Sequence, residues 1–241
     1  MQSSVFDILL LIARPAAGKS EIIHFLTNLP KSERITRFHV GDFHQIDDFP
    51  MLWAWFEEDR LLSKMGLPRL HTDDQENFKY PYLWDLLIER ICLEYQKSCR
   101  DVNTGVDVTA LLEFSRGKEH GGYRSAFQHI DPAIAERMAI LYVNVPWEES
   151  LRKNRRRFNP DRPDSILEHG LPDEKLERLY KEEDWTELSS SDPEWITIQN
   201  RPVPYVVFEN ADDVTTDRGP ELASRLEDCL NRLWKLYRQP R

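Results

Sequence analysis

The stretch Val5–Leu29, VFDILLLIARPAAGKSEIIHFLTNL, decides the fold. Its first part, Val5–Ile12, is a nearly continuous apolar run, which is typical of a central parallel strand covered on both faces. A Pro/Ala/Gly segment follows, and then apolar residues return at helical spacing until Pro30. The stretch therefore predicts a buried strand, a loop and a helix, which together form a first βα unit.

The loop of this unit matches the phosphate-binding pattern G-x-x-x-x-G-K-[ST] except at its first position, where Ala13 replaces glycine. In such a loop, successive backbone N–H groups and the following helix N-terminus point at phosphates. Lys19 would reach the β- and γ-phosphates, and the Ser20 hydroxyl would bind Mg²⁺. Gly18 would let the backbone come close to the ligand. The predicted nucleotide-binding residues are Ala13, Arg14, Pro15, Ala16, Ala17, Gly18, Lys19 and Ser20.

Alanine tolerates positive φ poorly, at a cost of roughly 1 kcal/mol. We therefore expect Ala13 either to have negative φ or to carry mild strain.

Four more segments read as strands, separated by helical stretches, and a helix closes the chain. This alternation predicts one α/β domain, residues 1–241, with a five-stranded, mostly parallel sheet and helices on both faces. The further expected strands are Arg34–Val40, Val106–Phe114, Met138–Val145 and Val203–Phe208, and the closing helix is Pro220–Tyr237.

Two long segments interrupt the alternation. Residues 43–105 read as a helical insertion that would bind a second substrate. Its aromatic residues, such as Trp53 and Tyr80, can either stack on a planar substrate or pack in the core. Residues 152–201 are polar and too long for a simple connection, so we expect a lid and a connector there. We expect the segment at His120 to be a simple connector.

The composition disfavours several classes of protein. The 241 residues carry a formal net charge of −10, which disfavours nucleic acid as a partner. The three cysteines have no C-x-x-C spacing and the histidines no metal-ligand spacing, so a cytoplasmic protein without disulfides or a transition metal is expected. The apolar run Val5–Ala13 is too short to span a membrane.

From these residues the chain resembles the P-loop kinases, which phosphorylate nucleotides, nucleosides and other small molecules. Only the phosphate loop is specific, and no subfamily can be assigned. The resemblance implies a three-layer fold, ATP and Mg²⁺ as cofactors, and a small-molecule phosphoryl acceptor. A nucleotide-binding regulatory module or an NTPase without such an acceptor is the alternative, favoured only by Ala13. A GTPase is disfavoured, because the last strand is followed by Glu209-Asn210-Ala211-Asp212 rather than N-K-x-D.

A kinase also needs a carboxylate at the metal, a group that orients or deprotonates the acceptor, and cations for the transferred phosphoryl group. Glu113, which closes the third expected strand, is the metal candidate. Arg116, which follows in an E-x-x-R pattern similar to the E-R-S stretch of nucleoside kinases although the spacing differs, would bind the nucleotide. Asp42 is the candidate general base, unless Gly-Asp is ordinary turn chemistry. Asp47 and Asp48 are expected to be solvated or to cap a helix.

Arg152, Arg155 and Arg156 lie at i, i+3 and i+4 and would share one helical face, as the arginines of kinase lids do. We expect Arg156 to act on the transferred phosphoryl group and Arg152 to bind the nucleotide. The alternative is a solvated face paired with Glu148 and Glu149. Asn210 follows the last strand, where ligands collect in open α/β sheets, and would either contact the nucleotide or shape a turn.

Overall fold

A computed structural model describes residues 3–101, 107–157, 161 and 170–240. Six strands form one sheet in the order β2-β3-β1-β4-β6-β5, and only β5, antiparallel to β6, departs from the parallel arrangement. The strands are β1 (Ile8–Ala13), β2 (Asp42–Asp47), β3 (Val108–Phe114), β4 (Met138–Asn144), β5 (Trp195–Ile198) and β6 (Arg201–Glu209).

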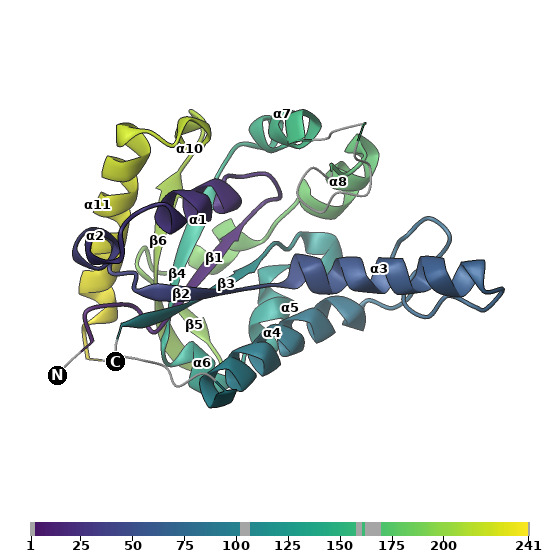
Figure 1. The fold of residues 1–241 in the computed structure, drawn as a ribbon, viewed down its shortest axis with the longest axis horizontal. Helices are drawn as coiled ribbons and strands as arrows, with labels where there is room; N and C mark the ends of the chain where they lie inside the picture. The colour runs from purple at the N-terminus through teal and green to yellow at the C-terminus, as the bar shows by residue number, and fades with distance from the viewer. Residues whose placement is uncertain (1–2, 102–106, 158–160, 162–169, 241) are drawn as a thin grey trace.

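Helices cover both faces of this sheet (Figure 1). Along the central strand β1, Ile8, Leu10 and Ile12 pack with α4 and α5, whereas Leu9 and Leu11 pack with α1 and α11 on the other face. The structure is thus the expected three-layer α/β fold. Its helices are α1 (Lys19–Thr27), α2 (Lys31–Glu33), η1 (Arg34–Phe38), α3 (Asp48–Lys64), α4 (Tyr82–Asp101), η2 (Lys118–His120), α5 (Gly122–Gln128), α6 (Pro132–Ala135), α7 (Trp147–Arg157), α8 (Asp173–Tyr180), α9 (Trp185–Ser189), α10 (Val214–Asp217) and α11 (Pro220–Tyr237).

Two expectations about the sheet are wrong. The segment Arg34–Val40 is not a strand: η1 is a turn of π-helix, closed by His39 at φ 54°, and the strand is β2, a few residues later. Buried Arg34 stabilises this turn by donating to the carbonyls of Leu29 and Gly41. The expected five strands are six, because β5, within the segment expected to be a connector, forms a hairpin with β6.

Helices α3 and α4 project together beyond the sheet, and α8 lies beside the first half of α3 (Figure 1). Helices α3 and α4 pack against each other through the buried side chains of Leu52 and Trp55 of α3 and Leu83 and Leu87 of α4. The helical part of the insertion therefore begins at Asp48, because residues 42–47 belong to the sheet.

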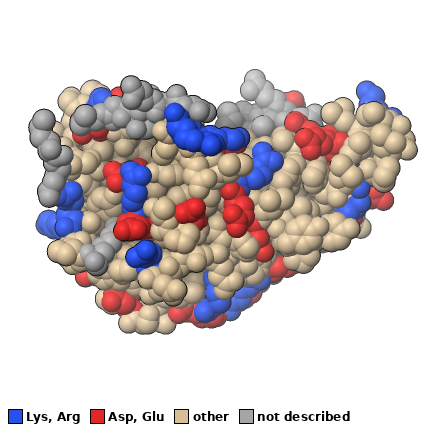
Figure 2. Space-filling model, turned by 90° about the horizontal axis from the view of Figure 1, so that it is seen from below, with Lys and Arg blue, Asp and Glu red and all other residues tan. Residues whose placement is uncertain are grey.

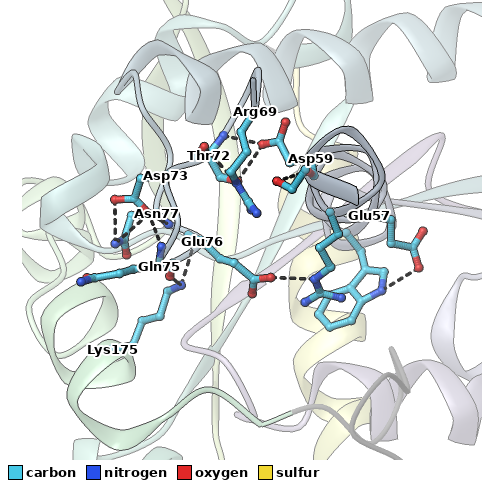
Figure 3. A network of polar contacts seen from close by, with 12 residues as sticks. Glu57, Asp59, Arg69, Thr72, Asp73, Gln75, Glu76, Asn77 and Lys175 are labelled. Atoms are coloured by element: carbon cyan, nitrogen blue, oxygen red, sulfur yellow. Dashed lines mark hydrogen bonds and ion pairs between the residues drawn. The ribbon is translucent and has the colours of Figure 1, made fainter. Parts of the chain in front are cut away.

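A buried carboxylate organises the loop that joins α3 to α4. Asp59 is fully buried and accepts hydrogen bonds from the backbone N–H groups of Leu70, His71 and Thr72 and from the Thr72 hydroxyl (Figure 3). Burial alone would raise the pKa of Asp59, but these hydrogen bonds outweigh it and hold the pKa below its usual value. The loop is thereby fixed to the end of α3.

Helix α8 is fastened to this loop. Lys175 Nζ donates to the carbonyls of Gln75, at 3.2 Å, and Glu76, at 2.9 Å (Figure 3). Arg178, one turn later, donates to Asn77 Oδ1 at 2.7 Å. The 73–77 turn and α8, about 100 residues apart in the sequence, are therefore held together by polar contacts.

Charges of both signs alternate over the face seen from below the sheet, where Lys and Arg side chains lie beside Asp and Glu (Figure 2). Within the described ranges, none of the helices combines the length and the apolar character that crossing a bilayer requires.

Candidate functional site

A cavity of about 530 Å³ opens where β1, β2 and β3 end. Because these strands are parallel, their carboxyl ends lie at the same edge of the sheet, with Asp47 of β2 level with Glu113 of β3. The described wall residues are Pro15–Glu21, Asp47–Phe49, Leu52, Trp84, Glu113–Arg116, Lys153, Asn154, Arg156, Arg157, Leu171, Tyr180, Thr216 and Arg218.

The phosphate loop forms one wall, and its backbone explains the departure at Ala13. Ala13 is the last residue of β1, fully buried and extended, so this alanine carries no positive-φ strain. The left-handed residues are instead Ala16, at φ 57°, and Gly18, at φ 112°. A Cβ on Gly18 would lie 2.6 Å from Thr215 Oγ1, so only glycine fits there.

The side chain of Arg14 braces the loop instead of pointing at a ligand. It donates to the carbonyls of Val145, Tyr180 and Lys181 and forms a 3.0 Å ion pair with Glu183. These contacts occupy the Arg14 guanidinium, so the structure does not support the expectation that this group binds the nucleotide.

Asn210 holds the loop from behind. Its Nδ2 donates to the carbonyl of Ala17 and to Thr215 Oγ1, both at 2.8 Å, and its Oδ1 accepts from the Thr215 N–H. Asn210 is fully buried and lies outside the cavity wall. Of the two roles considered for it, the structure agrees with shaping a loop and not with contacting a nucleotide through the side chain.

Lys19 and Glu113 meet at the centre of the cavity. Lys19 Nζ lies 2.8 Å from Ser115 Oγ and 3.8 Å from Glu113 Oε1, and Glu113 also accepts a hydrogen bond from Gln45. Burial raises the pKa of Glu113, an effect that the Lys19 ammonium opposes. The two predicted residues are thus brought together from the phosphate loop and from β3.

Asp42 is not part of this site. It begins β2, at the opposite edge of the sheet, five residues or about 17 Å of extended strand from Asp47. Its carboxylate is 58% exposed and forms ion pairs with Lys31 and Arg34. The expectation that Asp42 faces the acceptor is therefore wrong, because it depended on a strand that would have ended at Val40.

Asp47 occupies the place that was expected for Asp42. It ends β2, lines the cavity and caps α3 by accepting the Phe49 N–H at 3.0 Å. Burial, together with the nearby carboxylates of Glu113 and Asp48, raises its pKa to about 8. The expected capping role is confirmed, but the position in the cavity was missed. With the strand placed at residues 42–47, the Asp47-Asp48 pair between that strand and the next helix would have indicated a carboxylate at this edge of the sheet.

Arg116 does line the cavity, but its charge is already paired. The side chain is only 2% exposed, and Nη1 lies 2.6 Å from Asp48 Oδ2. The guanidinium also donates to the carbonyls of Ser115 and Trp84. Asp48 is therefore a buried ion-pair partner and not a solvated residue.

The three arginines of α7 separate in the structure. Arg156 lines the cavity, as do Lys153 and Arg157. Arg152 is half exposed outside the wall and pairs with Glu149 and Asp213, so the structure does not support its expected contact with the nucleotide. The alternative, a solvated charged face paired with Glu149, agrees with the structure for Arg152. Much of the expected lid, residues 158–160 and 162–169, lies outside the described residues, and the rest of 152–201 comprises several separate elements.

The donor set fits a hard divalent cation. Ser20 and the carboxylates of Glu113 and Asp47 present oxygen atoms to one cavity, the ligands that Mg²⁺ prefers. Across the described part of the chain, no three His, Cys, Asp or Glu side chains gather into a cage. A Mg²⁺ ion here would therefore depend on phosphate and water for its remaining ligands, as Mg²⁺ usually does.

Comparisons with known proteins leave the family open. No protein-family model and no curated protein matches the sequence. Three solved structures are similar over nearly the whole chain: an unliganded sugar kinase from Janibacter sp. HTCC2649 (12% identity, 95% of both chains, TM-score 0.41), TT1252 from Thermus thermophilus (12%, 98% of this chain and 100% of that one, 0.46) and APE1195 (14%, 94% and 98%, 0.41). At these scores the likeness carries no argument about activity.

Proposed function

We propose that the protein is an ATP-dependent phosphotransferase that acts on a hydroxyl group of a small molecule. The observation that carries this proposal is the meeting of the phosphate-loop Lys19 with the carboxylates of Glu113 and Asp47 in one cavity. A passive nucleotide binder needs the loop alone, whereas phosphoryl transfer needs groups across from it that position a metal and an acceptor.

Each residue then has a role. Lys19 holds the β- and γ-phosphates, while Ser20 and Glu113 would hold Mg²⁺, which neutralises phosphate charge when bound. The acceptor oxygen forms a bond to the γ-phosphorus as the bond to the bridging β–γ oxygen breaks, and ADP leaves. Asp47 takes the proton of the acceptor hydroxyl. Arg156 stabilises the charge that spreads over the transferred group.

Nucleotide binding is tested by thermal unfolding with ATP and Mg²⁺. At a ligand concentration of about 100 Kd, binding stabilises a protein by roughly 2.7 kcal/mol. For a chain of this length that corresponds to a rise in Tm of about 5–10 °C. Lys19→Ala should abolish the rise, and Lys31→Ala, an exposed lysine at the far edge of the sheet, should keep it. The absence of a shift in the unmutated protein with any nucleoside triphosphate would contradict the proposal.

Transfer is tested with labelled ATP and a panel of small hydroxyl compounds. Asp47→Asn keeps a helix-capping residue and should lower turnover at least about 100-fold with nearly unchanged ATP affinity. Asp42→Asn is the matched control and should leave turnover unchanged. If Asp42→Asn were the inactive variant instead, the assignment of the base to Asp47 would be wrong.

A further inference from the structure

The cavity has two chemically different sides. The phosphate side is formed by the phosphate loop, α7, and residues 216 and 218. The opposite side, which we call the acceptor side, is formed by the start of α3, by α4, by the end of β3 with the residues after it, and by α8. Its described residues are Asp47, Asp48, Phe49, Leu52, Trp84, Phe114, Ser115, Arg116 and Tyr180.

The cations are distributed unequally between the two sides. Among the described wall residues, five of the six cations lie on the phosphate side or reach in from it: Lys19, Lys153, Arg156, Arg157 and Arg218. The acceptor side contributes only Arg116. Apart from Lys153, which is paired with Asp213, the cations of the phosphate side match a triphosphate, and the acceptor side gives little to a second anion.

Arg116 is moreover committed to the protein. Its guanidinium is buried, lies 2.6 Å from Asp48, and donates to two backbone carbonyls. It also contacts two aromatic rings, with its central carbon 5.3 Å from the ring centroids of both Trp84 and Phe114. A phosphate could recruit this arginine only by displacing Asp48, which would leave a buried carboxylate unpaired.

Apart from the Tyr180 phenol, the other ionisable groups described at or beside the acceptor side are carboxyl groups, not cations. Asp47 lies at the cavity wall, and Glu113 is level with it on the neighbouring strand. Asp47 must be ionised to take the proton of an acceptor hydroxyl, and in that state an acceptor phosphate placed beside it would be repelled in a poorly solvated site. The acceptor side therefore selects against anions.

The same side offers flat and apolar surface. Phe49, Leu52, Trp84 and Tyr180 all contribute to the wall. The Trp84 ring is held by the His120 ring, stacked at 3.7 Å between centroids and 17° between planes, so the indole is a rigid part of the wall. Because His120 and Arg116 both lie against the Trp84 ring, the wall would contact a ring-containing ligand through apolar packing and not by stacking on this indole.

We propose that the phosphoryl acceptor is an uncharged, ring-containing alcohol, and that its phosphorylated counterparts are excluded. The inference rests on the proposed function and narrows it to a substrate class. The paired Arg116, the carboxylates and the aromatic wall carry it together.

The experiment compares matched acceptors that differ only by a phosphate group. The pairs are nucleosides with their 5′-monophosphates and aryl-substituted sugars with their phosphate esters, all at saturating ATP and Mg²⁺, with ADP release as the readout. We expect kcat/KM to favour the uncharged member of an accepted pair by at least about 100-fold. Preference for the phosphorylated members, or for amino alcohols that carry a positive charge, would overturn the inference while leaving the phosphotransferase proposal intact. Failure to bind ATP would instead overturn the proposed function itself.

A charge variant tests the reason for the selectivity. Asp48→Asn releases the Arg116 guanidinium and should raise the kcat/KM of the phosphorylated member, relative to its uncharged counterpart, by about 10-fold or more. Asp74→Asn removes a carboxylate from the exposed 73–77 turn and should leave this ratio unchanged. An unchanged ratio in a folded Asp48→Asn protein would show that the ion pair does not set the selectivity. Should that variant not fold, the matched pairs in the unmutated protein decide the substrate class alone.

Discussion

His120 is a buried imidazole that carries a specific pH dependence of stability. Its side chain is only 5% exposed, is stacked on Trp84 and packs edge-on against Tyr180. Among the described residues neither ring nitrogen has a hydrogen-bond partner. Burial lowers the pKa of His120 to about 3, and the positive charges of Arg116 and Arg178 add to the effect.

The sign and size of the effect follow from this pKa. An unfolded histidine has a pKa near 6.5. Between about pH 6.5 and pH 3, His120 therefore binds a proton in the unfolded chain but stays neutral in the folded chain. Stability is therefore fully present above pH 6.5 and falls as the pH is lowered towards 3. Each pH unit corresponds to about 1.4 kcal/mol, so two units, from pH 6.5 to 4.5, cost about 3 kcal/mol.

The assay is urea unfolding at pH 7 and pH 4.5. His120→Gln cannot titrate, so it should lose about 3 kcal/mol less stability between these pH values than the unmutated protein does. The glutamine has its own cost at this site, but that cost is the same at both pH values and cancels. His120→Phe serves if the amide is too disruptive, and His44→Gln, an exposed histidine of β2, should keep the unmutated pH dependence. Equal losses in all these proteins would show that His120 is not held neutral by burial.

Two further substitutions test the placement of side chains around the phosphate loop. Arg156→Ala should lower kcat about 100-fold in a phosphoryl-transfer assay with a smaller effect on ATP affinity, because its charge is used in the transition state. Arg155→Ala, outside the cavity wall, should leave kcat unchanged, and equal losses would deny Arg156 a special role. Asn210→Ala removes the hydrogen bonds of Asn210 to the Thr215 N–H and the Ala17 carbonyl, so urea unfolding should show a loss of about 1–3 kcal/mol, and calorimetry should show weaker ATP binding. Unchanged ATP affinity would mean that Asn210 does not position the loop.

The sequence predicts the interior of the sheet better than its edges. Strands β1, β3, β4 and β6 are apolar runs, and any strand covered on both faces needs such a run. By contrast, β2 and β5 are the edge strands, and only one of the six residues of β2 is buried. The apolar residues of η1 have the sequence pattern of a strand. The contacts of Arg34 with the carbonyls of Leu29 and Gly41 are what favour the π-helical turn over a strand.

Within the candidate site, residues that belong to a local sequence motif could be predicted, whereas ion pairs between residues far apart in the sequence could not. Lys19 and Glu113 were found because a phosphate loop and a strand end are visible locally. The pairing of Arg116 with Asp48 spans 68 residues, and Arg152 finds Asp213 across 61. Helical spacing places Arg152 and Arg156 on one face, but it cannot show which of them meets an acidic partner from another part of the chain.

Helix α8 joins the two sides of the cavity. The carbonyls of Tyr180 and Lys181, at its C-terminal end, accept hydrogen bonds from Arg14 of the phosphate loop. Lys175, one and a half turns earlier, holds the 73–77 turn at the far end of the insertion (Figure 3). Because Tyr180 also lines the cavity, this helix fixes the distance between the loop that would hold ATP and the wall that would hold the acceptor. Phosphoryl transfer depends on placing two substrates within reach of each other, so in the proposed function α8 would help to set that placement through its contacts with the phosphate loop and through Tyr180 in the wall.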